Sequence, residues 1–480
     1  MEAPTASFYW YDLETSGTTP SADRILQFAG FRTDLNLNPI DEPFETYVKL
    51  PPDIVPIPAS CLVTGITPQR TIEAGLDEWE VVSKINRIFS VPETCVVGFN
   101  NLRFDDEFVR NALYRNFLDP YAREWRNGNS RWDLIDLVRT AGAIRPEGIE
   151  WPRLDDSPSF RLEAMTHANN LRHDTAHDAL SDVRATVALA NLLRLKQPRL
   201  FSYSLKLRKK HLVRRLLMPF GQRLCVQTSQ TFSNQRYCMA PVMSIAQHPI
   251  IENSIITVDL GRDVSHLIDG TTEEIRDALF SKDVEERPPL NQVRVNQCPF
   301  VAPITVLRPG DAKRLAINLD IVRKRQQALL STSDLDKKIS RVFIERGRQN
   351  EGRDPEDLLY EGFIPDADRS RGEELQRSLR LKAPWPDLKF EDPRMEIMFE
   401  RLKARLRPEV LSSGALESWN QFVGKRLTTE HPKRLTIEAY KRDVKKRLET
   451  VSGSRDKSIL RDLESYGIEL DKRASQWVIE

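Results

Sequence analysis

The N-terminal stretch Phe8-Tyr-Trp-Tyr-Asp-Leu-Glu-Thr15 restricts the possible folds more than any other part of the chain. Its aromatic run favours a β-strand, which Ser16-Gly17 would end. Residues i and i+2 of a strand face the same side, so we expect Asp12 and Glu14 to project together. Neighbouring carboxylates repel, and Mg²⁺ prefers such oxygen ligands. Because a lone D-x-E is more often an ordinary strand end, a metal site needs ligands from elsewhere in the chain.

The segments that follow alternate between strand and helix patterns. Residues 24–32 and 45–50 are expected strands, which would form a three-stranded antiparallel meander with the first. Residues 95–100 have the apolar composition of a buried strand. Helical patterns cover residues 73–89, 105–117, 134–141, 161–170 and 179–196. This order favours an α/β sheet with helices packed against it.

The pattern changes after residue 198. Segments 224–228, 237–240, 254–259 and 292–296 predict a small β domain, and the chain is helical and strongly charged from 321 onward. Residues 1–198 carry 20 basic and 29 acidic side chains, whereas residues 199–480 carry 51 and 41. A catalytic domain joined to a polyanion-holding domain would show this contrast, although drifting composition in charged helices would also produce it. We expect domains at 1–198, 199–350 and 351–480.

Length and composition exclude several classes of protein. A chain of 480 residues is too long for one ordinary core. No segment has the length and apolar character of a membrane span, and the first residues do not resemble a signal peptide. Five widely spaced cysteines without a C-x-x-C pair argue against a disulfide framework or a zinc site. A cytoplasmic protein is expected.

A second candidate ligand follows the strand at 95–100. Asp105 lies where that strand gives way to a helix, and α/β sheets place their sites at this carboxyl edge. The alternative is that Asp105 or Asp106 is only the N-cap of the helix.

A third motif contains His177 and Asp182. On one continuous helix their side chains would diverge. If Asp178 caps the helix, however, His177 lies in the preceding loop and Asp182 in the first turn, and both can point to one site. Alternatively, His177 is a surface residue and Asp182 a first-turn acid favoured by the helix dipole.

Together these residues are the parts of a two-metal phosphodiesterase. The four acids would hold two divalent ions ~4 Å apart, one activating water and one stabilising the leaving oxygen. Histidine titrates near neutrality, so His177 can take the proton of the attacking water.

The three motifs also resemble a known family. Asp12-x-Glu14, Asn101-x-x-Phe104-Asp105 and His177-x₄-Asp182 are similar, in order and separation, to the motifs of the DnaQ-like 3′→5′ exonucleases that use a histidine. The resemblance extends to bacterial exonuclease I through residues 99–107, 114–121, 129–133, 145–149, 158–163, 197–201, 296–299, 305–309 and 359–369. It implies an α/β ribonuclease H-like nuclease domain, a small β-barrel-like domain and a C-terminal helical domain.

The resemblance also implies an activity and roles for residues. The expected reaction is Mg²⁺-dependent 3′→5′ hydrolysis of single-stranded DNA to nucleoside 5′-monophosphates, serving DNA repair and recombination. Asp12, Glu14, Asp105 and Asp182 would bind two Mg²⁺, with Mn²⁺ as a substitute. His177 would be the general base, and Glu14 would also approach the 3′-terminal nucleotide.

Binding a single strand requires cations for phosphates and flat groups for bases. The matching segments offer both kinds, in Arg110, Tyr121, Trp125, Arg139, Phe160 and Arg161. We expect Phe160 and Arg161 to lie nearest the 3′ end. The alternative is that the aromatic residues belong to the core and the arginines are merely exposed.

The family also implies a protein partner. Exonuclease I enzymes dock the acidic C-terminal tail of single-strand DNA-binding protein, which needs cations beside an apolar slot. The candidate cations are Arg308, Lys313, Arg314, Arg323 and Lys324, and a solvated charged face is the alternative. By resemblance the protein is a monomer.

Two other functions are compatible with parts of the sequence. A ribonuclease or proofreading exonuclease of the same superfamily needs only the nuclease domain, whereas this chain has ~280 further residues. A recruiting protein that binds single strands with a decayed site would not be expected to keep all five motif residues.

Overall fold

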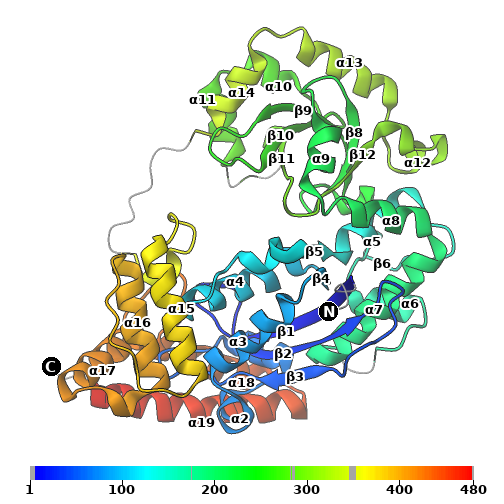
Figure 1. The fold of residues 1–480 in the computed structure, drawn as a ribbon. Coiled ribbons are helices and arrows are strands. Elements are labelled where there is room, and N and C mark those ends of the chain that lie inside the picture. The colour runs from blue at the N-terminus through cyan, green and yellow to red at the C-terminus, as the bar shows by residue number, and fades with distance from the viewer. Residues whose placement is uncertain (1–5, 174–175, 282, 284–286, 345–352, 478–480) are drawn as a thin grey trace. The chain divides into compact units, whose positions relative to one another are not determined.

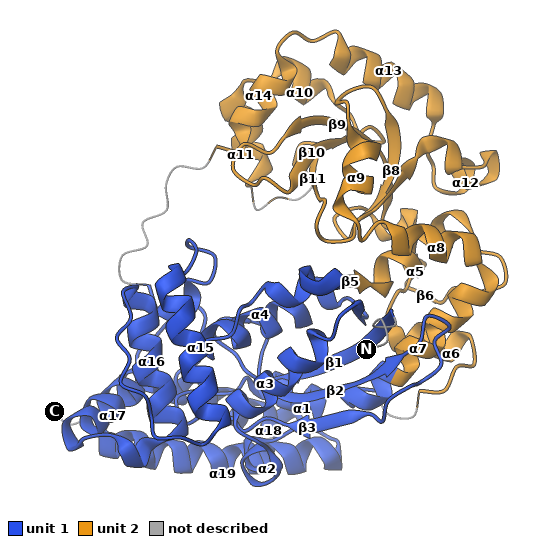
Figure 2. Ribbon diagram, viewed as in Figure 1, with its two compact units in different colours: residues 1–130, 174–183, 350–480 blue, residues 131–173, 184–349 orange. Residues whose placement is uncertain are grey.

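The computed structural model describes residues 6–173, 176–281, 283, 287–344 and 353–477 (Figure 1). The chain divides into two compact units (Figure 2). Unit 1 comprises Met1–Ser130, Asp174–Val183 and Asn350–Glu480, and unit 2 comprises Arg131–His173 and Arg184–Gln349.

Unit 1 is built on strands in the order β3-β2-β1-β4. β1 (Ser7–Thr15) pairs antiparallel with β2 (Ile25–Thr33), and β2 pairs antiparallel with β3 (Phe44–Tyr47), which confirms the predicted meander. β4 (Thr94–Gly98) pairs parallel with β1, so the carboxyl ends of both strands lie at one edge of the sheet. All residues of β1 are buried except Asp12, which is partly exposed.

Within residues 6–129, four α-helices precede β5 (Ser130–Asp133): α1 (Pro58–Thr64), α2 (Pro68–Ala74), α3 (Glu78–Phe89) and α4 (Asp105–Arg115). Apolar side chains of α3 and α4 form a core with aromatic residues of β1 and β2. The prediction of one helix over 73–89 was wrong at its start, because Gly75 ends α2 in an extended conformation. A Cβ on Gly75 would lie 2.3 Å from the Thr71 carbonyl oxygen, so this close approach requires glycine.

The C-terminal part of unit 1 is helical, as predicted. It comprises α15 (Asp366–Arg380), α16 (Pro393–Leu406), α17 (Ser413–Thr428), α18 (Ile437–Thr450) and α19 (Ser454–Trp477). α17, α18 and α19 share a core with α1 and with Leu26 of β2. α15 and α16 pack around Tyr114 and Phe117 at the end of α4. These helices therefore pack against the part of unit 1 that carries β1.

Unit 2 contains the predicted small β domain. Five antiparallel strands lie in the order β11-β10-β9-β8-β12. Their bounds are β8 (Leu224–Thr228), β9 (Met239–Gln247), β10 (Ser254–Asp259), β11 (Leu290–Arg294) and β12 (Phe300–Pro303). β12 was not predicted from the sequence, because it is short and ends in a proline.

Helices and a short hairpin complete unit 2. They are α5 (Leu134–Ile144), β6 (Arg153–Leu154), β7 (Ser157–Pro158), α6 (Leu162–Ala168), α8 (Pro198–Lys206), α9 (Lys210–Leu217), α10 (Ser265–Asp269), α11 (Thr272–Leu279), α12 (Pro309–Arg314), α13 (Leu319–Leu330) and α14 (Leu335–Val342). α7 (Ala179–Lys196) begins in unit 1 and continues in unit 2. No helix in the described ranges is both long and apolar enough to cross a membrane.

Candidate active site

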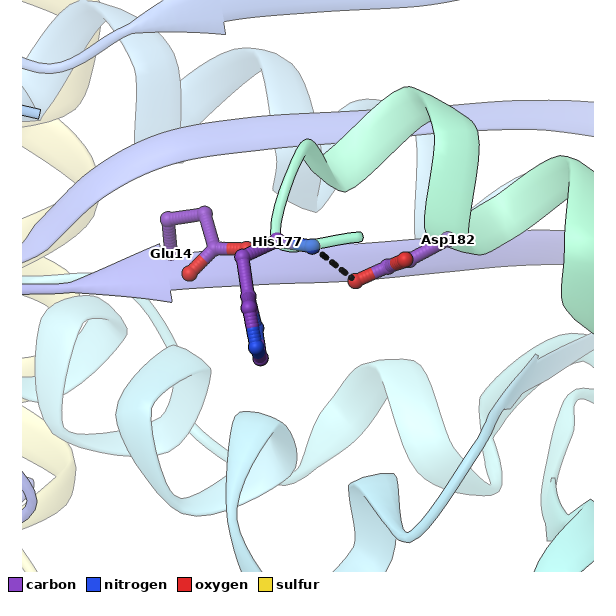
Figure 3. Close-up of side chains that lie close together, drawn as sticks. All are labelled: Glu14, His177 and Asp182. Atoms are coloured by element: carbon purple, nitrogen blue, oxygen red, sulfur yellow. Dashed lines mark hydrogen bonds between the residues drawn. The ribbon is translucent and has the colours of Figure 1, made fainter. Parts of the chain in front are cut away.

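Glu14, His177 and Asp182 come together at the end of β1 and the start of α7 (Figure 3). Each offers one possible ligand atom, and these atoms all lie within 4.8 Å of one another. Glu14 is buried, Asp182 is partly exposed and His177 is exposed. Three of the five predicted residues thus form one group that is open to solvent on the histidine side.

The start of α7 explains how residues five positions apart reach the same group. Asp178 Oδ2 accepts a hydrogen bond from the Ser181 backbone N–H at 3.1 Å, which confirms the predicted cap. His177 precedes the cap in a left-handed conformation with φ 61°. Its backbone N–H donates to Asp182 Oδ2 at 3.3 Å. The reversal at His177 and the first turn of α7 therefore place both side chains beside Glu14.

Electrostatic interactions connect Asp12 and Asp105 with this group. Burial, followed by the negative charges of Asp105, Glu14 and Asp182, raises the pKa of Asp12. Burial, followed by Asp182 and Asp105, raises the pKa of Glu14 to about 8. The four predicted acids thus form one cluster of repelling charges, to which Asp178 adds a charge that the sequence analysis treated only as a cap.

Asp105 is the first residue of α4, and it is 5% exposed. The N-cap of α4 is Phe104, so the alternative in which Asp105 or Asp106 is the N-cap is wrong. Asp106 is fully buried and pairs with Arg123 at 2.8 Å. Arg123 was not predicted from the sequence, because no periodic pattern marks the short 3₁₀ helix η2 (Ala122–Glu124) that carries it.

The chemistry of the acidic cluster fits a divalent cation. Oxygen ligands are what Mg²⁺ and similar hard cations prefer. A bound cation would also relieve the repulsion that raises the pKa of Glu14 and of Asp12. A histidine beside such a site can exchange a proton with water, and the arrangement is therefore suited to metal-assisted hydrolysis.

The predicted DNA-contacting residues of unit 1 surround η2. Trp125 is 64% exposed, with the Arg126 guanidinium 5.6 Å from its ring centre, and Tyr121 is partly buried. Arg110 is buried, and it donates to both carboxylate oxygens of Glu124 at 2.7 and 2.9 Å. The Arg110 guanidinium lies 5.5 Å from the centre of the Tyr121 ring.

The remaining three lie in unit 2. Arg161 is exposed at the start of α6, whereas Phe160 is 8% exposed and packs edge-on against Tyr237. Arg139 is buried, with its guanidinium 5.9 Å from the centre of the Phe160 ring. It also pairs with Asp136 at 3.0 Å.

The candidate partner-binding cations also lie in unit 2, and they are not equivalent. Arg308 pairs with Glu147 at 2.6 Å, and Arg314 lies 5.1 Å from the centre of the Tyr237 ring. Arg323 makes an exposed pair with Asp320 at 3.5 Å. Lys313 and Lys324 are exposed.

Three family models match the chain in succession. The model described as "Exonuclease" matches residues 9–190, the "Exonuclease I SH3-like domain" matches 208–345, and the "Exonuclease I C-terminal domain" matches 353–470. The second range contains all five strands of the small β domain.

Whole proteins align over nearly the full length. Exodeoxyribonuclease I of Haemophilus influenzae is 38% identical over 97% of this chain and 98% of its own. The zinc-bound complex of Escherichia coli exonuclease I with single-stranded DNA is 36% identical, with a TM-score of 0.92 over 97% of this chain and all of that chain. A structure of exonuclease I with single-strand DNA-binding protein and an inhibitor is also 36% identical, with a TM-score of 0.89 over 97% of this chain and 100% of that chain.

Proposed function

Because this chain belongs to the exodeoxyribonuclease I family, we propose that it hydrolyses single-stranded DNA from the 3′ end and releases nucleoside 5′-monophosphates. The observation that carries this proposal is the group of Glu14, His177 and Asp182, which two distant motifs bring within 4.8 Å. The related complex with single-stranded DNA supports the substrate class. DNA repair and recombination are the proposed setting.

The proposed cofactor is Mg²⁺, two ions per site, with Mn²⁺ as a substitute. Asp12, Glu14, Asp105 and Asp182 would hold the metal, and the raised pKa of Glu14 and Asp12 supports this assignment. When bound, the metal would supply Lewis-acid stabilisation of charge on the phosphodiester. Glu14 would also approach the 3′-terminal nucleotide.

His177 is the proposed general base. Its exposed imidazole lies beside the Glu14 and Asp182 carboxylates, where a ring nitrogen can take the proton of an attacking water. The hydrogen bond from its backbone to Asp182 holds the loop, so the imidazole stays at the group.

Six side chains are the proposed contacts to the strand: Arg110, Tyr121, Trp125, Arg139, Phe160 and Arg161. The exposure of Trp125 and Arg161 supports their roles. Two further pairs place a guanidinium over an aromatic ring, Arg110 with Tyr121 and Arg139 with Phe160. Arg110 and Arg139 are buried and paired with Glu124 and Asp136, so their proposed contacts, like that of Phe160, rest on the resemblance to exonuclease I.

The organisation and setting of the protein complete the proposal. Domains at 1–198, 199–350 and 351–480 are supported by the matched ranges 9–190, 208–345 and 353–470. Docking of the acidic tail of single-strand DNA-binding protein is supported by the related complex. A cytoplasmic location is supported by five free, buried cysteines, and a monomer is proposed.

A substrate panel tests the activity. The protein is incubated with 5′-labelled single-stranded DNA, duplex DNA and RNA of one sequence, in Mg²⁺ and in EDTA, and the products are separated by chromatography. The proposal expects nucleoside 5′-monophosphates from single-stranded DNA in Mg²⁺ only. Equal cleavage of RNA would indicate a ribonuclease, and tight binding without cleavage would indicate a recruiting protein.

A further inference from the structure

Arg123 lies between two proposed DNA contacts, but its side chain points into the protein. Trp125 is 64% exposed, whereas the Arg123 side chain is 0% exposed. Its Nη2 donates to Asp106 Oδ1 at 2.8 Å, and its guanidinium lies 5.2 Å from the centre of the Phe89 ring. The segment Tyr121–Trp125 is therefore anchored in the interior by the residue at its centre.

Asp106 connects that anchor to both strand-end motifs. It immediately follows Asp105 at the start of α4. The same Oδ1 accepts a hydrogen bond at 2.9 Å from the hydroxyl of Tyr11, which immediately precedes Asp12 on β1. One carboxylate oxygen thus joins three segments, two of which carry a proposed metal ligand at the adjacent position.

The charge of the Arg123 guanidinium is compatible with its ion pair to Asp106. Burial is the largest influence on Arg123 and lowers its pKa, but the charges of Asp106 and Glu124, Tyr11 and the hydrogen bond to Asp106 together raise that pKa, so the guanidinium stays charged. A buried ion pair often adds little net stability. The Arg123–Asp106 pair instead holds β1, α4 and η2 in one arrangement.

A second attachment ties the same segment to α4. Glu124 accepts two hydrogen bonds from Arg110, which also donates to Glu107 at 2.7 Å. Arg123 and Glu124 therefore hold η2 against the first two turns of α4. These contacts connect Tyr121–Trp125 to the turn that carries Asp105.

We propose that Arg123 is a positioning residue that couples strand binding at Tyr121–Trp125 to the placement of Asp105 in the metal site. This inference rests on the proposed function. A strand seated on the segment fixes η2, η2 fixes Asp106 through Arg123, and Asp106 fixes the adjacent Asp105. Loss of the link lowers turnover without weakening the affinity for DNA.

A charge-balanced double variant, Arg123→Met with Asp106→Asn, removes the link and leaves the net charge beside the site unchanged. We expect kcat on a single-stranded oligonucleotide to fall by ~10-fold or more, since small misplacements of catalytic groups have effects of this size. KM should stay within about 2-fold of the wild-type value, because the strand-facing side chains are retained. Without DNA, half-maximal thermal stabilisation should require more Mn²⁺.

The matched control removes an equivalent pair at the other end of the same helix. Arg115 pairs with Glu78 of α3 at 2.8 Å, and Arg115→Met with Glu78→Gln is also charge-balanced. The control is expected to lower Tm but to keep kcat and the Mn²⁺ midpoint of the wild type. Equal losses of kcat in both variants would indicate a general destabilisation of α4 and would overturn the proposal.

Four further results test the coupling and the proposed function separately. Wild-type kcat and Mn²⁺ midpoint in the folded double variant overturn the proposal, and so does a rise in KM alone. If the double variant does not fold, Arg123→Gln removes the ion pair between η2 and Asp106 and leaves the Tyr11 hydrogen bond in place. An unchanged kcat and Mn²⁺ midpoint in that variant overturn the coupling. Failure of the wild-type protein to cut single-stranded DNA refutes the proposed function instead, and the Mn²⁺ titration then still tests the link.

Discussion

At the scale of single residues, the candidate site is defined by carboxylates whose mutual repulsion a bound cation would relieve. Glu14 shows this most clearly, because burial and the nearby acids raise its pKa from 4.5 to about 8. The strand-end D-x-E pattern indicated that these carboxylates would be neighbours. It could not give the size of the effect, which depends on Asp105 and Asp182 from distant parts of the chain.

The raised pKa of Glu14 predicts how pH changes the effect of metal. A carboxyl with a raised pKa in the folded state contributes stability below its ordinary pKa and loses it as pH rises through the folded pKa. The metal-free protein should therefore lose stability between about pH 4.5 and about pH 8. Mg²⁺ replaces the bound protons, so its effect on Tm should grow over the same interval. Thermal melts in EDTA and in Mg²⁺ measure this, and a metal effect independent of pH would contradict it.

His177→Ala tests the proton-transfer role. We expect kcat to fall by ~10²–10⁴-fold, the usual contribution of a general base, with unchanged affinity for single-stranded DNA in EDTA. The control is His266→Ala, which removes an exposed histidine of α10. Steady-state digestion and fluorescence anisotropy give the two quantities. A wild-type kcat for His177→Ala would exclude the imidazole as the base.

At the scale of elements, the cap of α7 decides whether His177 and Asp182 share a site. Asp178→Ala should remove the hydrogen bond to Ser181 and destabilise the protein by about 0.5–2 kcal/mol. It should also lower kcat, because the turn at His177 loses its support. Asp178→Asn keeps the cap and should keep most of the activity.

A cap of similar kind elsewhere is the control for this prediction. Ser412 accepts a hydrogen bond from the Ala415 backbone N–H at 3.2 Å and caps α17. Ser412→Ala should cause a comparable loss of stability in chemical denaturation without changing kcat. If Asp178→Asn is as inactive as Asp178→Ala, the charge of this residue matters rather than its cap.

The elements that carry the site differ in how far the sequence could predict them. The strand ending in Asp12 and Glu14 and the helix beginning after Asp178 were predicted because their signals are local: aromatic composition, a following Ser-Gly and a capping residue. The end of α2 at Gly75 was not predicted, because it depends on the backbone that packs against that glycine. Arg123 was not predicted either, since its partner Asp106 lies 17 positions away.

At the scale of the whole molecule, buried ion pairs attach the C-terminal helices of unit 1 to the part that carries the site. Glu356 is 2% exposed and accepts hydrogen bonds at 2.6 Å from both Arg24 and Arg405. Arg405 also pairs with Asp53 at 2.7 Å. Arg24 lies directly before β2, so the helical part braces the strand beside Glu14.

Glu356→Gln should be strongly destabilising. It removes a negative charge that four guanidinium groups share, those of Arg24, Arg405, Arg426 and Arg401. Breaking a buried pair in this way typically costs about 3–5 kcal/mol. The control is Glu438→Gln, which breaks the exposed pair with Arg442 at 2.9 Å and should cost at most about 1 kcal/mol. Urea denaturation followed by circular dichroism compares the two, and equal losses would contradict a bracing role.

The most direct test of the whole account is a timed digest of a 5′-labelled single-stranded oligonucleotide by the wild-type protein and by Asp182→Asn, in Mg²⁺ and in EDTA. The account predicts a ladder that shortens from the 3′ end with wild-type protein in Mg²⁺ only. Asp182→Asn should bind the oligonucleotide with wild-type affinity and leave it uncut. Wild-type cleavage by Asp182→Asn, or cleavage in EDTA, would contradict the claim that the acidic cluster at β1 and α7 is a metal-dependent exonuclease site.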